Sequence, residues 1–358
     1  MKATSTLLLR RSARVRALAL MAPMLLGTAS AQGLSQPVAA TSQNSPVAQG
    51  AGSTFVQPLL TAWAAVYKDE TSRDIEYRPV GSGAGLDEMT AGRADFGATD
   101  QPLTSQELAK ANLVQFPIAF GAIVPVVNIA GVKAGQLRVT GSLLADIFSG
   151  KVNWWDDPAI KKLNPSLKLP HAQIAIVHRS DSSGTTFNFT HYLSQVSPTW
   201  KNSVGEGKIV KWPTSIGAAG NGAIADWVQK IPNSIGYAEY AYVLTNDLTY
   251  ACVENSSGQF VCPSAESLAS ALRKTDWDPD RDFYVVPTNA KGLDSYPIIG
   301  GTFIVMPKRA KDKERSDAAL RFFRYGLENG QVEAGALNYA PLPDDLVSKI
   351  ENYLKAHR

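Results

Sequence analysis

The chain has few of the side chains on which metal centres and many enzymes depend. Its 358 residues include four histidines, scattered at positions 171, 178, 191 and 357. Zinc and metallophosphatase sites need clustered His, Cys or Asp ligands, so we expect no bound metal. The sequence also lacks Gly-x-Ser-x-Gly, a Walker loop, and Gly-x-Gly-x-x-Gly with an acidic partner. Serine-hydrolase, nucleotide and dinucleotide chemistry therefore have no signature here, and we expect no cofactor and no catalytic residue.

Cysteine is equally scarce, with only Cys252 and Cys262 in "YACVENSSGQFVCP". Turn-forming residues 255–258 lie between two short runs that suit strands, so the pair is expected to close a hairpin as a disulfide in an oxidising compartment. Such a short loop would contribute roughly 2 to 3 kcal/mol. Two reduced, buried thiols remain the alternative. Neither cysteine has a histidine nearby, which argues against a catalytic thiol or a zinc site.

Long hydrophobic runs are missing beyond the first 31 residues. That segment has a basic lead, a short apolar run and the small-x-small site Ala29-Ser30-Ala31, which together predict a cleavable signal peptide. The paired Arg10 and Arg11 leave export by the general or the twin-arginine route open. Without the segment, the chain has 30 basic and 32 acidic residues and a net charge of about −2. No basic stretch with interleaved aromatics is present, so nucleic-acid binding is not expected.

The remaining length, about 327 residues, exceeds what one hydrophobic core usually serves and predicts two domains. Residues 32–49 are polar and aperiodic and are interpreted as a flexible leader. Beyond them, strand-like and helix-like segments alternate, as is typical of an α/β architecture. "FPIAFGAIVPVVNI" predicts one or two buried strands, "IIGGTFIVMP" another strand, and "ERSDAALRFFRYGLENG" an amphipathic helix.

Three glycine-rich turns each lead directly into a predicted helix. In "GAGSTF", Ser53 or Thr54 can cap the helix that follows. Its expected apolar face is Phe55, Leu59, Trp63, Val66 and Tyr67. "VGSGAG" precedes a short helix around residues 86–91, and "RSDSSGTTF" separates the strand "QIAIVHR" from the helix "TTFNFTHYLSQV". Backbone N–H groups and small hydroxyls at helix starts suit anions, so these turns are candidate anion-binding sites.

The stretch "RSDSSGTTF" carries the strongest chemical signal of the three. Arg179 supplies a bidentate positive charge, Ser183, Gly184 and Thr185 supply short donors, and Asp181 is the expected support of Arg179. A tetrahedral oxyanion needs this combination. An ordinary Ser/Gly-rich loop that caps a helix is the plain alternative. A phosphate-ester hydrolase is a further alternative, with His178 as the nearby base.

The motifs "GAGSTF", "VGSGAG", "ADFGATDQPL" and "RSDSSGTTF", in this order and spacing, resemble those of the PstS family. These proteins are the periplasmic phosphate-binding subunits of the ABC phosphate importer, and weaker similarity extends over nearly all the chain after the signal peptide. The resemblance implies that phosphate is bound by Ser53, Thr54, Phe55, Ser82, Asp100, Arg179, Ser183, Gly184 and Thr185.

Asp100 is the unexpected member of this set, because a carboxylate repels an anion. Phosphate keeps a proton at neutral pH, which Asp100 can accept, whereas sulfate has none to give. A buried site that requires a donor rejects an analogue without it by roughly 10⁴-fold or more. Asp100 would therefore select phosphate over sulfate.

The resemblance further implies a type II-like, two-domain α/β clamshell with the ligand in the interdomain cleft. Domain I would comprise residues 50–121 and 300–358, and domain II residues 122–299. The expected function is to bind inorganic phosphate in the periplasm and deliver it, as a monomer, to a membrane-embedded permease with its cytoplasmic ATPase. An exported phosphate-binding or adhesion protein without a transport role remains the alternative.

Overall fold

The structure is a computed structural model that describes residues 46–213, 216–273 and 275–357. The expected signal peptide, and the leader as far as residue 45, lie outside the described residues. The strands, in chain order, are β1 (Ala48–Gly52), β2 (Ile75–Arg78), β3 (Phe96–Thr99), β4 (Leu113–Asn128), β5 (Leu137–Val139), β6 (Ala175–Arg179), β7 (Ile216–Ala218), β8 (Ser234–Glu239), β9 (Thr249–Glu254), β10 (Phe260–Val261) and β11 (Ile299–Pro307).

Helices alternate with the strands along most of the chain, as the sequence predicted. They are α1 (Gln57–Thr71), α2 (Ser82–Thr90), α3 (Ser105–Ala111), α4 (Gly141–Phe148), α5 (Pro158–Leu163), α6 (Gly184–Val196), α7 (Pro198–Ser203), α8 (Gly220–Lys230), α9 (Tyr240–Thr245), α10 (Ala265–Leu272), the 3₁₀ helix η1 (Pro279–Arg281), α11 (Lys313–Asn329), α12 (Gln331–Ala336) and α13 (Asp344–His357).

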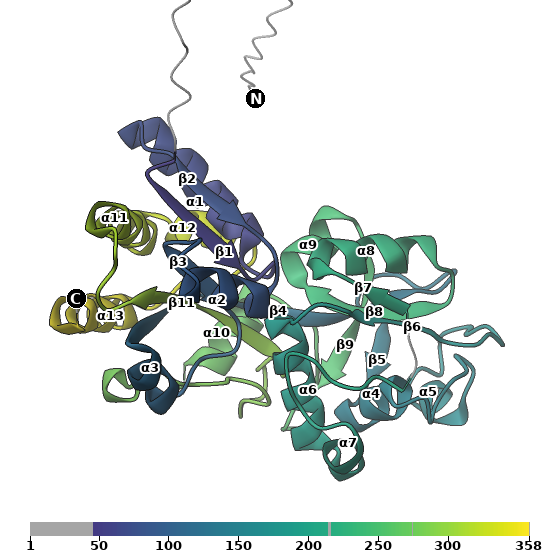
Figure 1. Ribbon diagram of the computed structural model, residues 1–358. Helices are drawn as coiled ribbons and strands as arrows, with labels where there is room; N and C mark the ends of the chain where they lie inside the picture. The colour runs from purple at the N-terminus through teal and green to yellow at the C-terminus, as the bar shows by residue number, and fades with distance from the viewer. Residues whose placement is uncertain (1–45, 214–215, 274, 358) are drawn as a thin grey trace, which may run out of the picture. The chain divides into compact units, whose positions relative to one another are not determined.

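Strand β4 joins two groups of strands, which we call the first and second lobes (Figure 1). Its residues 113–122 pair antiparallel with β11, which continues to β3, β1 and β2 in the first lobe. Residues 123–128 pair with β8, which continues to β6 and β7 in the second lobe. All but the last residue of β4 are buried, which explains its continuous apolar run. The expected division into domains at residues 121/122 and 299/300 stays a prediction.

Two local expectations were wrong. β1 begins at Ala48, inside the stretch interpreted as leader, because Ala48 is buried and the strand pairs with both β2 and β3. Helix α1 begins at Gln57 with no side-chain cap. Ser53 does not cap it, because its hydroxyl bonds elsewhere, to Asp100 and to the N–H of Phe55.

The core of the first lobe is aromatic. α1 buries Leu59, Leu60, Trp63 and Tyr67, while the expected Val66 is only half-buried. The Trp63 ring lies edge-on to Phe322 of α11, and its Nε1 donates to the carbonyl of Gly330 at 2.8 Å. Burying large aromatic side chains in this way supplies much of the apolar surface that stabilises a lobe.

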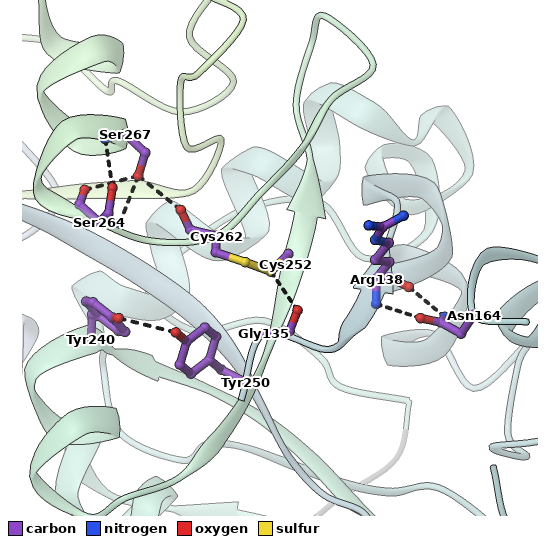
Figure 2. The surroundings of a disulfide bond; sticks show 9 residues. All are labelled: Gly135, Arg138, Asn164, Tyr240, Tyr250, Cys252, Cys262, Ser264 and Ser267. Atoms are coloured by element: carbon purple, nitrogen blue, oxygen red, sulfur yellow. Dashed lines mark hydrogen bonds between the residues drawn. A yellow bond between two sulfur atoms is a disulfide. The ribbon is translucent and has the colours of Figure 1, made fainter. Parts of the chain in front are cut away.

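The predicted disulfide is confirmed between Cys252 and Cys262 (Figure 2). Cys252 lies in β9, and Cys262 directly follows β10, the antiparallel partner of β9. In Figure 2 the disulfide lies between Gly135 on one side and Ser264, the N-cap residue of α10, on the other. The bond therefore holds the hairpin where the chain turns into α10.

Candidate anion-binding site

The nine residues expected to bind an anion come from the ends of strands and the starts of helices in both lobes. In the first lobe, Ser53 to Phe55 join β1 to α1, Ser82 begins α2, and Asp100 follows β3. β1 and β3 are parallel neighbours, so their carboxyl ends meet at one edge of the sheet. In the second lobe, Arg179 ends β6, and Ser183 caps α6 by accepting from the N–H of Thr186.

Arg179 is the positive charge of the site, and its side chain is only 1% exposed. Its Nε donates to Oδ1 of Asp181 at 2.7 Å and its Nη2 to Oδ2 at 2.5 Å. Nη1 donates to the hydroxyl of Thr185 at 3.3 Å. Burial acts to raise the pKa of Asp181, but the hydrogen bond and charge of Arg179 outweigh it and hold the pKa below its usual value. This two-point contact fixes the plane of the guanidinium.

Asp100 is buried, and hydroxyl groups donate to both of its oxygens. Ser53 Oγ donates to Oδ2 at 2.6 Å, and Thr302 Oγ1 donates to Oδ1 at 2.7 Å. Burial raises the pKa of Asp100 to about 6, against the lowering effect of these hydroxyls and of the Arg179 charge. The carboxylate is therefore mainly ionised at neutral pH and can only accept hydrogen bonds.

Hydrogen bonds join the two lobes at this point. Ser82 Oγ accepts from the N–H of Gly184 at 3.1 Å and from the N–H of Asp100 at 3.3 Å. Asn188 Nδ2 donates to the carbonyl of Asp100 at 2.7 Å. A Cβ at Gly184 would lie 2.5 Å from Ser82 Oγ and 2.6 Å from the Cβ of Asp100, so only glycine allows this approach.

Two further polar residues, Asn221 and Thr302, contact the candidate site residues. Asn221, at the start of α8, donates from its backbone N–H and from Nδ2 to Thr54 Oγ1 at 3.1 and 2.9 Å, and from Nδ2 to Thr185 Oγ1 at 3.3 Å. The available signal was "GNG", a fourth glycine-rich helix start. Thr302 belongs to β11 and gave no local signal, since nothing around it predicts a contact with Asp100.

Glu239 is a buried carboxyl beside the site. Its Oε2 accepts from the N–H of Ala241 at 2.9 Å, and its own N–H donates to Oδ1 of Asn221. Burial raises the pKa of Glu239 to about 8, opposed by backbone N–H groups of α9. The hydroxyl of Tyr339 donates to the carbonyl of Phe55 at 2.6 Å. Glu239 therefore lies near a contact between the lobes, and none of the ion pairs among the described residues includes it.

The ring of His178, the base of the hydrolase alternative, packs against an aromatic side chain. Its ring stacks on Trp212 with centroids 5.0 Å apart, and Nδ1 pairs with the carbonyl of Arg179 at 2.9 Å. Burial lowers its pKa. Among the described residues, no group of three His, Cys, Asp or Glu side chains could hold a metal ion, and no helix is long and apolar enough to cross a membrane.

Comparison with known proteins shows the family of the chain. Residues 36–329 match the model of the PBP superfamily domain. The chain is 50% identical to the phosphate-binding protein PstS of Xylella fastidiosa over 317 residues, which cover 88% of this chain and 87% of that protein. The chain belongs to the PstS family. The PstS of Pasteurella multocida is 45% identical over 302 residues, covering 84% of this chain and 88% of that protein.

A solved structure shares the fold of this PstS-family chain. It is a putative phosphate ABC transporter substrate-binding protein with bound phosphate from Clostridium perfringens, with a TM-score of 0.60 and 22% identity. The match covers 83% of this chain and 99% of that one. The α/β fold of periplasmic binding proteins, expected from the resemblance, is confirmed.

Proposed function

We propose that this protein binds inorganic phosphate between its two lobes and delivers it to an ABC-type phosphate importer. The observation that carries the proposal is the pairing of a fixed cation with a buried acceptor. Arg179 is held by Asp181, while Asp100, whose pKa Arg179 lowers, faces the same cradle of hydroxyl and N–H groups. The names of the PstS relatives, which describe phosphate-binding proteins, support the same ligand.

The cradle can distinguish a protonated anion from one without protons. Arg179 Nη1, the hydroxyls of Thr54, Ser82 and Thr185, and the N–H of Gly184 are potential donors to phosphate oxygens. Ionised Asp100 would accept the remaining phosphate proton. Sulfate would place an oxygen lone pair against Asp100, so that two acceptors would face each other without a proton between them. Leaving a buried acceptor without a donor costs about 1 to 3 kcal/mol, and more when the acceptor is charged.

Phosphate would also favour closure of the lobes. In the structure, one of the expected phosphate donors, the N–H of Gly184, donates to Ser82 Oγ of the opposite lobe. A ligand that contacts both lobes stabilises the closed form by its differential affinity for it. We propose that residues 50–121 and 300–358 form one body and residues 122–299 the other, with β4 and the segment before β11 as the connections.

We also propose where the protein acts and with which partners. The protein would act as a monomer in the periplasm, exported by its signal peptide, and would meet a membrane permease that works with a cytoplasmic ATPase. We propose a binding protein and not an enzyme, since His178 stacks on Trp212 and its Nδ1 is paired with a backbone carbonyl.

Calorimetry on the exported form, stripped of phosphate, tests the proposal. Tight binding of phosphate with much weaker binding of sulfate is expected. Absent phosphate binding, or equally tight sulfate binding, would refute it. Turnover of a phosphate ester that is lost in His178→Ala would instead support the hydrolase.

A further inference from the structure

A basic groove lies on the first lobe, between the β11–α11 loop, α11 and α13. Its volume is about 750 Å³. Figure 1 shows α11 and α13 in the first lobe, on the side remote from the second lobe. Six cations line the groove, and this set defines it: Lys308, Arg309, Lys313, Arg321, Arg324 and Lys355. A second hollow of about 630 Å³ shares Lys308 and Arg309 with it and adds His357.

The positive charge of the groove is only partly balanced. Among the described residues, Asp317 is the one acid that lines it, and Lys313 pairs with Asp317 at 2.6 Å, while Lys355 pairs with Glu351 at 3.6 Å. In the described part of the chain, Lys308, Arg309 and Arg321 have no ion pair. The chain after the expected signal peptide is slightly acidic, so this concentration of cations is local. Such a surface attracts anions.

The groove has no exposed large hydrophobic side chain. Among the described residues, those side chains are Val80, Ile209, Trp227, Leu244, Leu293 and Val332, and none lines it, while Leu320 and Leu354, which do line it, are buried. Protein interfaces have apolar or aromatic centres, and membrane-surface segments insert apolar anchors. A flexible, hydrophilic polyanion needs neither.

The spacing of the cations favours a linear ligand. Lys313 and Arg321 are eight residues apart on α11, or roughly 12 Å at 1.5 Å per residue. Lys308 and Arg309 precede the helix and extend the row. A single phosphate ion is too small to contact all of these groups together. We propose that the basic groove binds linear inorganic polyphosphate at a site separate from the cradle between the lobes.

The test uses the exported form of the whole chain with saturating inorganic phosphate, so that the cradle is filled. Binding of labelled polyphosphate would be followed by fluorescence anisotropy at low and moderate salt. In Arg309→Glu/Arg321→Glu we expect about tenfold weaker binding or more, with a shallower salt dependence. Arg309→Gln/Arg321→Gln, which keeps exposed polar side chains, should give an intermediate loss and guards against misfolding.

The matched control is Lys168→Glu/Lys201→Glu, which makes two charge reversals at exposed lysines on the second lobe. It should bind polyphosphate like the wild type. Equal losses in both double variants, or none in Arg309→Glu/Arg321→Glu, would overturn the proposal. Binding to vesicles of anionic phospholipid that is as strong as to polyphosphate would also overturn it, in favour of membrane docking. Calorimetry should give the same affinity for inorganic phosphate in Arg309→Glu/Arg321→Glu as in the wild type. This result would show that phosphate binding between the lobes is intact and that any loss of polyphosphate binding arises in the groove.

Discussion

The hydroxyl of Ser53 donates to Oδ2 of Asp100 at 2.6 Å and accepts from the N–H of Phe55 at 3.0 Å. One small side chain therefore links an expected phosphate donor to the carboxylate that we propose accepts the phosphate proton. Thr302 holds the other oxygen of Asp100 in the same way. Both hydroxyls favour the ionised carboxylate, in opposition to its burial.

Ser53→Ala should weaken phosphate binding in a pH-dependent way. Loss of the donor raises the pKa of Asp100 further, so less of the carboxylate is ionised near neutral pH. A hydrogen bond to a charged group contributes about 1.5 to 3 kcal/mol, so we expect about tenfold weaker binding near pH 6.5. The difference should shrink by pH 8.5, where Asp100 is ionised in both proteins. Calorimetry at the two pH values measures this, and Ser203→Ala is the control. An equal loss at both pH values would contradict it.

Discrimination against sulfate should narrow as the pH falls through about 6, the pKa of Asp100. Protonated Asp100 can donate a hydrogen bond to sulfate, whereas the ionised form cannot. Asp100→Asn, with an amide donor at every pH, should relax discrimination and remove its pH dependence. Competition calorimetry with both anions across this range provides the measurement. If the ratio of affinities in the wild type stays constant, selectivity arises at another residue.

Gly184→Ala should hold the lobes apart. The added Cβ would meet Ser82 Oγ and Asp100 at 2.5 to 2.7 Å. Overpacking costs about 1 to 3 kcal/mol, which predicts roughly ten- to hundredfold weaker phosphate binding. Gly222→Ala, early in α8, is the matched control because its Cβ would meet only Tyr242 at 3.6 Å.

The test measures phosphate affinity, and urea unfolding without phosphate, for both glycine variants. Separation of the lobes should relieve the clash, so Gly184→Ala is expected to lose affinity more than stability. A loss of affinity in Gly222→Ala as large as in Gly184→Ala would argue against a steric cause at Gly184.

Glu239 should make the protein less stable at alkaline pH. Burial raises its pKa from 4.5 to about 8 in the folded state. Its contribution to the free energy of unfolding is therefore full below about pH 4.5 and is lost as the pH rises through about 8, at about 1.4 kcal/mol per pKa unit. Glu239→Gln cannot ionise and should lose less stability between roughly pH 5 and pH 9.

Urea unfolding of wild type and Glu239→Gln at both ends of this range tests the effect. The exposed Glu314→Gln serves as the control for removal of one acidic charge. Parallel stability curves for wild type and Glu239→Gln would show that Glu239 does not titrate in this range.

The sequence by itself determined the features that depend on near neighbours. The alternation of strands and helices, the disulfide hairpin, and the contact between Arg179 and Asp181 all join residues a few positions apart. Hydrophobic periodicity and turn chemistry carry this information locally. The start of β1 was misjudged because a short, small-residue strand is buried by its partners and not by its own pattern.

The tertiary structure alone decided how the site is completed. β11 lies between β3 and β4 and brings Thr302 to Asp100, 202 residues earlier in the chain. Ser82 meets Gly184 across 102 residues, and Asn221 meets Thr54 across 167. Burial sets the pKa values of Asp100 and Glu239, and burial depends on the packing of distant elements. A local sequence pattern does not specify the order of the strands in a sheet, so these contacts can be identified only in the folded chain.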